Sequence, residues 1–382
     1  MKSSRVTSGM DRRYFLATTG SGLLAAAVPK AGDAAGFVTG KTAGTASRSA
    51  VGSAAPDPSS MRKIPIGVFD PVYKDLSMDA MLDKVSALGL EAMEIGTGGY
   101  PEAHHCPIDE LLADGGKAKA WQKKFEDRGI HVATLSCHGN PIHPDPKHAT
   151  RDAETFRKTV LLAERLDVKV IVGFSGCPGA SPSDTQPSWV TYRWPPEYAE
   201  MQDWQWKEKV VPYWKEAVKF AREHGIHKLA FEMHPNFVVY NPRTLLKLRE
   251  AVGEEIGANC DLSHLFWQGC DPVEVIHFLG KQGAIYHAHM KDTAFYPDNV
   301  NKYGVLNFAF EKTDLPLASE TFRAVGYGHG AELWKSIIRA YMDIGYQGIL
   351  SIENEDPILA GEVGVERAAY VLKNVRNELL GT

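Results

Sequence analysis

The sequence predicts one domain of the α/β class, a (β/α)8 TIM barrel. Short runs of β-branched and other apolar residues recur eight times after Met61. Helix-length segments with apolar residues at three- and four-residue spacing lie between these runs. Eight βα units in about 320 residues are typical of a closed parallel barrel inside a ring of helices. A doubly wound open sheet is the alternative, but no G-x-G-x-x-G motif follows the first predicted strand.

Eight segments are predicted as the strands of the barrel, because each is short and rich in β-branched or apolar residues. In chain order they are 64–69, 91–95, 131–135, 168–174, 228–232, 257–261, 284–289 and 348–353.

Helices are predicted where apolar residues return every three or four positions. Gly129, Gly225 and Gly345 follow three such segments and precede a strand, as expected of glycines that end helices. The helices are predicted over 78–88, 154–166, 208–223, 243–252, 272–280, 332–344 and 363–379.

Two connections are long: residues 175–207 follow the fourth strand and residues 290–330 follow the seventh. Loops of this length in a compact domain are usually binding loops or lids. Both would leave the barrel at the C-terminal ends of its strands, where barrel enzymes hold their active sites. The tryptophans of 175–207 would either cover a ligand or pack the insertion against the barrel.

The first sixty residues are predicted to lie outside the barrel. Arg12 and Arg13 precede a small, apolar run, so residues 1–30 resemble a twin-arginine signal peptide. Residues 31–60 are rich in Ala, Gly, Ser and Thr and predict a flexible linker, which leaves 61–382 for the barrel. We therefore expect a periplasmic or secreted protein, with an uncleaved N-terminal anchor as the alternative.

Charge and composition exclude several classes of protein. The 382 residues have a formal net charge of −5, but residues 1–60 hold 7 basic and 3 acidic residues, and the remainder holds 35 basic and 44 acidic residues. An acidic body lacks the basic footprint that nucleic-acid binding needs. No apolar run reaches 18 residues, so no integral membrane span is expected in the mature chain. The five cysteines form no C-x-x-C pair, which predicts neither a zinc ribbon nor a disulfide scaffold.

Acidic and histidine residues occupy the ends of the last four predicted strands. Because parallel strands of a barrel end on one face, these side chains are predicted to converge. Three crowded carboxylates repel one another unless a cation neutralises them. Three oxygen ligands and one imidazole suit a single divalent metal ion, Mn²⁺ first, with Mg²⁺, Co²⁺ or Zn²⁺ as alternatives. The four predicted ligands are Glu232, Asp261, His289 and Glu353.

Other polar residues near the strand ends are candidates for contacts with a substrate. Glu94 closes the second strand and His138 follows the third, and each would either reach a substrate hydroxyl or brace its own loop. His287 faces the interior together with His289, because strand side chains repeat every two residues, but it lies one layer deeper. We therefore predict that His287 is a hydrogen-bonded core group. Lys291 would hold a substrate oxyanion or form an ion pair with a neighbouring acid.

Motifs distributed over 64–380 resemble those of the xylose-isomerase-like TIM-barrel superfamily, the sugar phosphate isomerases and epimerases. Together they are specific for the superfamily and for a branch found beside sugar oxidoreductases, and they do not specify a substrate. They are GTGGYP at 96–101, SCHGNPIHP at 136–144, FSGCPG at 174–179, RWPPEY at 193–198, FEMHP at 231–235, DLSHLFWQG at 261–269, HAHMKDT at 287–293, VGYGHG at 325–330 and GYQGILSIENED at 345–356.

This resemblance implies roles for individual residues. Ketose 3-epimerases of the superfamily hold their metal with a Glu, an Asp, a His and a second Glu, at the positions of the four predicted ligands. Their D-x-x-H pattern implies that His264 binds substrate, and Trp267 follows in the same motif. The epimerases carry an arginine where this chain has Phe295, and Arg323 is the candidate to replace it.

The predicted function is that of a metal-dependent sugar isomerase or epimerase. The cation would stabilise an enediolate, while Glu232 and Glu353, on opposite faces of the substrate, would take and return a proton next to the carbonyl. A leaving group beta to the carbonyl would turn the same enolate chemistry into a lyase reaction. Related barrels act on 3-oxo-glycosides in this way, by elimination or hydration, and a lyase or hydratase of that kind is the first alternative.

Two further classes remain as alternatives. One is the metal-dependent abasic-site endonuclease that shares this barrel, against which the acidic body argues. The other is an exported sugar-binding protein that has lost catalysis. For the isomerase, the lyase and the sugar-binding protein alike, the partner is a small-molecule carbohydrate. The sequence leaves open a homo-oligomer or a partner subunit that closes the site.

Overall fold

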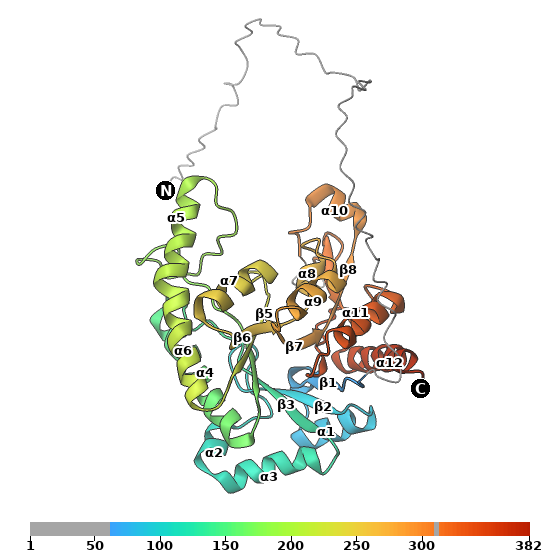
Figure 1. Cartoon of the computed structure of the whole chain (residues 1–382). Coiled ribbons are helices and arrows are strands. Elements are labelled where there is room, and N and C mark those ends of the chain that lie inside the picture. The colour runs from blue at the N-terminus through green and yellow to red at the C-terminus, as the bar shows by residue number, and fades with distance from the viewer. Residues whose placement is uncertain (1–61, 309–312) are drawn as a thin grey trace, which may run out of the picture. The chain divides into compact units, whose positions relative to one another are not determined.

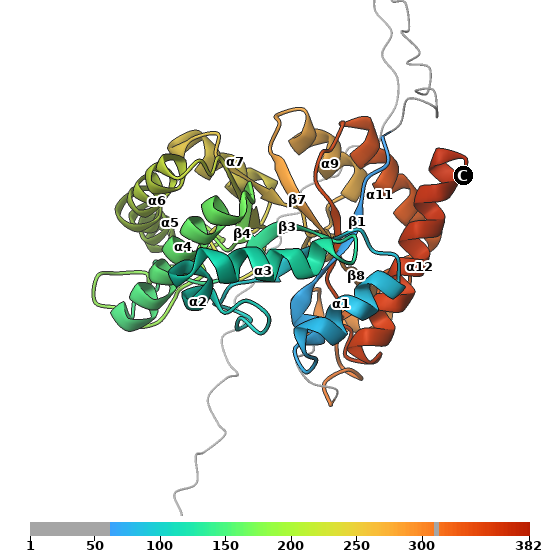
Figure 2. The same ribbon diagram turned by 90° about the horizontal axis from the view of Figure 1, so that it is seen from below.

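The computed structural model describes residues 62–308 and 313–382. The predicted signal peptide over 1–30 and the predicted linker over 31–60 lie outside these residues. The described residues fall within one compact unit. Eight parallel strands close into a barrel, and helices surround it (Figure 1, Figure 2). This confirms the predicted fold class.

All eight predicted barrel strands form, and no bound moves by more than two residues. Around the barrel their order is β1-β10-β7-β6-β5-β4-β3-β2, with every neighbouring pair parallel. Their bounds are β1 Ile66–Phe69, β2 Ala92–Gly96, β3 His131–Ser136, β4 Val170–Gly173, β5 Lys228–Glu232, β6 Ile256–Asn259, β7 Ile285–Met290 and β10 Leu350–Ile352.

The seven predicted helices also form. They are α1 Met78–Ala87, α4 Pro146–Leu166, α6 Val211–Glu223, α7 Pro242–Val252, α9 Pro272–Gly280, α11 Ala331–Asp343 and α12 Gly361–Leu380. The first residues predicted for α6 belong instead to a π-helical segment, Gln205–Val210, that runs into it. Further short helices are a 3-10 turn at Asp70–Tyr73, α2 Ile108–Ala113, α5 Pro196–Trp204, α8 Ser263–Phe266 and α10 Pro297–Tyr303.

The range of helix α3, Gly115–Glu126, was not predicted, although Gly129 was expected to end a helix. Only Ala118, Trp121 and Phe125 are buried along its twelve residues. A cap starts the helix instead of a hydrophobic pattern: the Asp114 carboxylate accepts hydrogen bonds from the N–H groups of Gly116 and Lys117.

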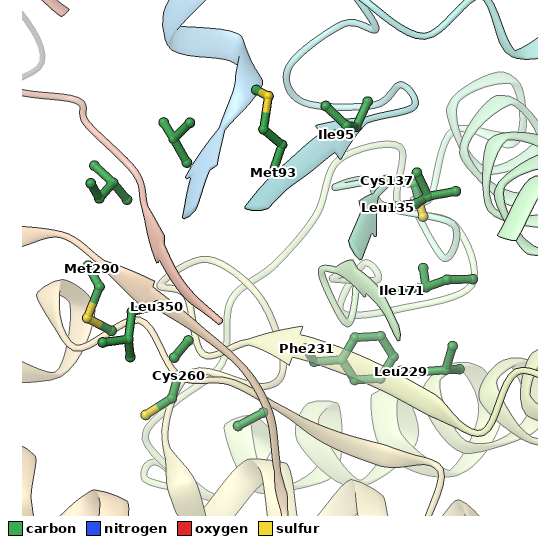
Figure 3. Packing of buried hydrophobic residues seen from close by; sticks show 14 of the residues in the cluster. Met93, Ile95, Leu135, Cys137, Ile171, Leu229, Phe231, Cys260, Met290 and Leu350 are labelled. Carbon is green, nitrogen blue, oxygen red and sulfur yellow. The ribbon is translucent and has the colours of Figure 1, made fainter. Parts of the chain in front are cut away.

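Apolar and polar side chains alternate along the barrel strands, and this alternation separates the core from the barrel interior. Met93 and Ile95 of β2, and Leu229 and Phe231 of β5, lie on the outer side of their strands, where the hydrophobic core fills the space beneath the helices (Figure 3). The residues between and beyond them, such as Glu94, point inward. Burial of the outer side chains supplies the main stabilisation, so the interior near the C-terminal ends of the strands is free to be polar.

The two long connections carry structure of their own. The connection after β4 contains α5, and the connection after β7 forms a two-stranded antiparallel sheet of β8 Asp292–Phe295 and β9 Glu320–Arg323. The Asp292 carboxylate closes this second connection by accepting hydrogen bonds from the N–H groups of Gly326, Gly328 and His329. Gly328 is required there, since a Cβ atom would lie 2.2 Å from the carbonyl oxygen of Thr293. Every helix in the described part of the chain is too short or too polar to cross a membrane.

Candidate active site

Four side chains converge at the C-terminal ends of β5, β6, β7 and β10. They are Glu232, Asp261, His289 and Glu353, and one ligand atom of each lies within 4.8 Å of the others. His289 Nδ1 lies 3.0 Å from Glu353 Oε2, 3.5 Å from Glu232 Oε2 and 4.0 Å from Asp261 Oδ2. Two atoms that each bond one ion at about 2.0–2.2 Å can be no more than about 4.4 Å apart. The separations from His289 Nδ1 therefore fit ligands of a single ion.

Two atoms of this cluster have unused hydrogen-bonding capacity. Asp261 Oδ2 and His289 Nδ1 are buried, and neither is aligned for a hydrogen bond with any described residue. Burial raises the pKa of Asp261, and although the Lys291 ammonium opposes this rise, the charges of Glu232 and Glu353 add to it. The carboxylates are thus crowded, and a divalent cation would bind the two atoms that lack an aligned hydrogen bond and compensate the negative charge that Lys291 leaves unbalanced. This donor set fits the predicted metal ion.

Glu94 lies beneath His289 inside the barrel and not at its mouth. It is fully buried, and its carboxylate accepts hydrogen bonds from His289 Nε2 at 2.9 Å, from His287 Nε2 at 2.7 Å and from Ser351 Oγ at 2.7 Å, as well as from Ser136. The expectation that Glu94 reaches a substrate hydroxyl is therefore corrected, because these groups occupy its oxygens. His287 is a hydrogen-bonded core group, as predicted. Holding the second nitrogen of a ligating histidine with a carboxylate is a common arrangement at metal sites.

Two histidines flank Glu232. His264 Nε2 lies 3.0 Å from Glu232 Oε1, and His138 Nε2 lies 3.2 Å from Oε2. Burial alone would raise the pKa of Glu232, but these two histidines and the Lys291 ammonium hold it well below its usual value. Burial, with the neighbouring His234 and Lys291, lowers the pKa of His264 to about 3. Its neutral ring donates from Nε2 to Glu232, which leaves Nδ1 as an acceptor that no described residue uses.

Lys291 lies among the acids of the cluster. Its Nζ is buried and lies 2.7 Å from Glu353 Oε2, 3.0 Å from Asp261 Oδ2 and 3.0 Å from Glu355 Oε2. Burial would favour the neutral amine, but these carboxylates hold the pKa of Lys291 well above its usual value. The ion-pairing role considered for Lys291 is therefore present in the structure, and the ammonium stays within reach of the site.

A cavity of about 520 Å³ lies beside this cluster, and none of the four cluster residues lines it. His264 and Glu355 line it and connect it to Glu232 and Lys291. The half-buried Trp267 also lines it, where a substrate would contact it. The other lining residues are Trp189, His234, Pro235, Asn236, Val305, Leu306, Phe308, Glu320, Thr321, Phe322 and Pro357.

Arg323 does not point into this cavity. Its Nε lies 2.8 Å from Asp356 Oδ2, which also accepts a hydrogen bond from the N–H group of Ala324. In β9 its neighbour Phe322 faces the cavity, so Arg323 lies on the opposite face of the strand. The expectation that Arg323 contacts substrate is corrected, because its guanidinium braces the end of the connection after β7.

Sequence reasoning missed two serines and an aromatic residue of the site. Ser136 and Ser351 hold Glu94 from inside the barrel, and their inward positions follow from the two-residue period of β3 and β10. The Phe322 ring lies with its centroid 4.6 Å from Lys291 Nζ and 5.3 Å from the ring centroid of His264. No local sequence pattern predicts that Phe322 lies at the site, because its position depends on the pairing of β8 with β9.

Comparison with known proteins identifies related sequences and folds. The model of the family described as xylose isomerase-like TIM barrel matches residues 82–375. The uncharacterized protein YfiH of Bacillus subtilis is 37% identical over 302 residues, which cover 78% of this chain and 95% of that protein.

Solved structures share the fold at lower identity. A D-tagatose 3-epimerase-like protein is 20% identical with a TM-score of 0.54, and the match covers 82% of this chain and 99% of that chain. The IOLI protein, solved with a bound zinc atom, is 18% identical with a TM-score of 0.55, and the match covers 83% and 98%. At these identities the likeness shows the fold alone.

Proposed function

The chain belongs to the xylose isomerase-like TIM barrel family, and on that premise we propose that it is a sugar isomerase or epimerase. It depends on one divalent metal ion and moves a proton next to a carbonyl group. The observation that carries this proposal is the convergence of four ligand-type side chains at the ends of four consecutive barrel strands, next to a cavity that His264 and Glu355 line. These side chains are Glu232, Asp261, His289 and Glu353.

The four residues would hold the ion, and a divalent cation there supplies positive charge that stabilises negative charge developing on a substrate oxygen. Manganese is the first choice, because three carboxylates and one imidazole form an oxygen-rich set, and Mg²⁺, Co²⁺ and Zn²⁺ remain alternatives. A zinc atom bound to the structurally similar IOLI protein is consistent with a metal in this fold.

Glu232 and Glu353 carry the proton transfer. They come from β5 and from the end of β10, at 3.5 Å and 3.0 Å from His289 Nδ1, and so approach a bound sugar from different strands. One carboxylate takes the proton from the carbon next to the carbonyl. The other returns a proton, either to the neighbouring carbon in an isomerisation or to the opposite face of the same carbon in an epimerisation. The neutral His264 accepts a hydrogen bond from a substrate hydroxyl at Nδ1, and Lys291 keeps Glu353 ionised.

A 3-oxo-glycoside lyase or hydratase that uses the same enolate chemistry is the second candidate. The size of the cavity is compatible with a glycoside, since about 520 Å³ lies within the range of about 300–1,000 Å³ of sites that enclose drug-sized ligands. In that reaction the proton is lost from the same carbon, and a group beta to the carbonyl leaves instead of a second proton being added.

Metal content and solvent exchange test the proposal together. We expect about one divalent ion per chain in the purified full-length protein by elemental mass spectrometry, and a clear loss of that ion in Glu353→Gln. Glu355→Gln is the matched control, because Glu355 also contacts Lys291 but lies outside the four-residue cluster. Glu355→Gln should keep its metal.

The loaded wild-type protein should then exchange solvent deuterium into the carbon next to the carbonyl of a ketose, and Glu353→Gln should not. Elimination products from 3-oxo-glycosides would favour the lyase. A metal-free wild-type protein after loading with Mn²⁺ would contradict the proposal. Sugar binding without any exchange would make the chain a catalytically silent sugar-binding protein.

A further inference from the structure

One wall of the cavity beside the four-residue cluster is formed by β9, and this wall contains a buried acid. Phe322 is at the floor of the cavity, against His264 and the Lys291 ammonium. Glu320 lies two residues earlier on the same face of the strand, about 6.8 Å farther along it. Both residues line the cavity. Glu320 therefore faces a part of the cavity that lies farther than Phe322 from the four-residue cluster.

The carboxyl group of Glu320 has an unusual environment for an acid. The residue is only 4% exposed, and its Oε2 has no hydrogen-bond partner among the described residues. The charged or titratable groups that share its cavity are His234, His264 and Glu355, and none of them forms an ion pair with it. On the neighbouring strand β8, the residue paired with Glu320 is Phe295, which is apolar. A buried polar group of this kind destabilises the fold unless a hydrogen-bond partner satisfies it, and a hydroxyl of a bound molecule can supply that partner.

A second unsatisfied polar group lines the same cavity. The indole Nε1–H of Trp189, from the connection after β4, is buried and donates to no described residue. Its ring packs edge-on against Tyr240, with ring centroids 5.5 Å apart, and this contact holds the ring in place. Two connections far apart in the chain thus each contribute one unused hydrogen-bonding group to a cavity that is lined in part by aromatic rings.

We propose that Glu320 and Trp189 form a subsite for a second sugar ring, so that the substrate is a glycoside of at least two rings and not a free monosaccharide. The reacting ring lies at the floor of the cavity, over His264, and the second ring lies between the aromatic walls. This inference rests on the proposed sugar chemistry and names the class of its substrate.

The chemistry of the two groups matches a hydroxylated ring. Burial raises the pKa of Glu320 to about 8, so its carboxyl group is largely protonated at neutral pH. A protonated carboxyl group offers one O–H donor and one carbonyl acceptor, which complement two neighbouring hydroxyls of a sugar. The Trp189 N–H adds a donor, and the faces of Trp267 and Phe322 offer apolar surface to the C–H side of the ring.

Sugar binding by the full-length chain tests this proposal without requiring turnover. The probes are maltose, cellobiose and trehalose, with glucose and fructose as single-ring controls, and the measurement is isothermal titration calorimetry of the metal-loaded protein. Wild type should bind at least one disaccharide about tenfold more tightly than either monosaccharide. Glu320→Leu should abolish this preference, and Trp189→Phe, which keeps the ring but removes the N–H, should weaken it about threefold.

Glu320→Gln is the conservative variant, because an amide keeps one donor and one acceptor without a charge. It should retain the disaccharide preference. Raising the pH through about 8 should weaken disaccharide binding to wild type, as Glu320 loses its proton, but not to Glu320→Gln. Glu332→Gln, on the exposed first turn of α11, is the control for a lost surface acid.

The proposal is overturned if no disaccharide binds wild type more tightly than the monosaccharides do, or if Glu320→Leu binds like wild type. Solvent-deuterium exchange into ketoses by the same preparations reports separately on the proposed reaction. Deuterium exchange without a preference for disaccharides would contradict only the proposed subsite. A preference for disaccharides without deuterium exchange would contradict only the proposed catalytic function.

Discussion

His289 Nε2 lies 2.9 Å from Glu94 Oε2, and this contact turns the opposite nitrogen of the ring toward the three acids at the barrel mouth. The same carboxylate accepts hydrogen bonds from His287 and Ser351, so Glu94 is itself held in place. A single buried acid from β2 thus determines which nitrogen of His289 is available to a metal ion. Glu94 therefore positions the His289 ring and lies one layer deeper in the barrel than a substrate would.

Glu94→Gln should lower the affinity for Mn²⁺ by about 10–100-fold, the usual effect of losing a group that orients a ligating histidine. Isothermal titration with the metal measures this effect. Ser351→Ala is the graded control, because it removes one hydrogen bond to Glu94 and leaves the contact with His289 intact. Its effect should be less than about threefold, as for one neutral hydrogen bond. An unchanged affinity in Glu94→Gln would show that His289 is oriented by other means.

Lys291→Met should destabilise the metal-free protein more than the metal-loaded one. Without the ammonium, the buried acids Asp261 and Glu353 lose their counter-charge, and breaking a buried ion pair costs about 3–5 kcal/mol. A bound divalent ion would replace much of that charge. Urea denaturation of both proteins, with chelator and with Mn²⁺, measures the difference. An equal loss of stability in the two conditions would contradict a cation at this place.

Arg323→Ala should act through the loop that Arg323 braces. Its ion pair with Asp356 is mostly buried, and its loss should lower the free energy of unfolding by about 1–3 kcal/mol. Asp356→Asn is the matched variant, since it weakens the same contact from the other side. Both should speed amide hydrogen exchange at Ala324 and affect sugar binding equally. If Arg323→Ala alone abolished sugar binding, Arg323 would contact substrate after all.

The export signal over residues 1–30 stays a prediction, and the paired arginines provide its test. Replacing both Arg12 and Arg13 with lysine preserves the charge but should keep the protein in the cytoplasm of a host with the twin-arginine pathway. Cell fractionation followed by immunoblotting measures the distribution. Replacing Lys2 and Arg5 in the same segment is the control, and that variant should still be exported. Export of the double-lysine protein would contradict the prediction of a twin-arginine signal.

The sequence by itself determined the barrel and the four-residue cluster. Strand and helix periods are local properties, and strands such as 228–232 carry them clearly enough that β5 has the predicted bounds. Because all strands of a closed parallel barrel end on one face, the position of Glu232 or Asp261 at a strand end was sufficient to predict that they meet. Helix α3 shows the limit of the same reasoning: Gly129 was expected to end a helix, but with only three of its twelve residues buried the range of that helix was not predicted.

Tertiary structure alone decided which partners the remaining side chains find. The stagger of neighbouring strands, with an irregularity between Met93 and Glu94, places Glu94 beneath His289 and not at the mouth. The pairing of Asp292 with Arg323, thirty-one positions apart in the chain, turns Phe322 and Glu320 toward the cavity and Arg323 toward Asp356. Local periodicity specifies the face on which a side chain lies, whereas the depth and the partner depend on contacts between distant segments, which no local pattern encodes.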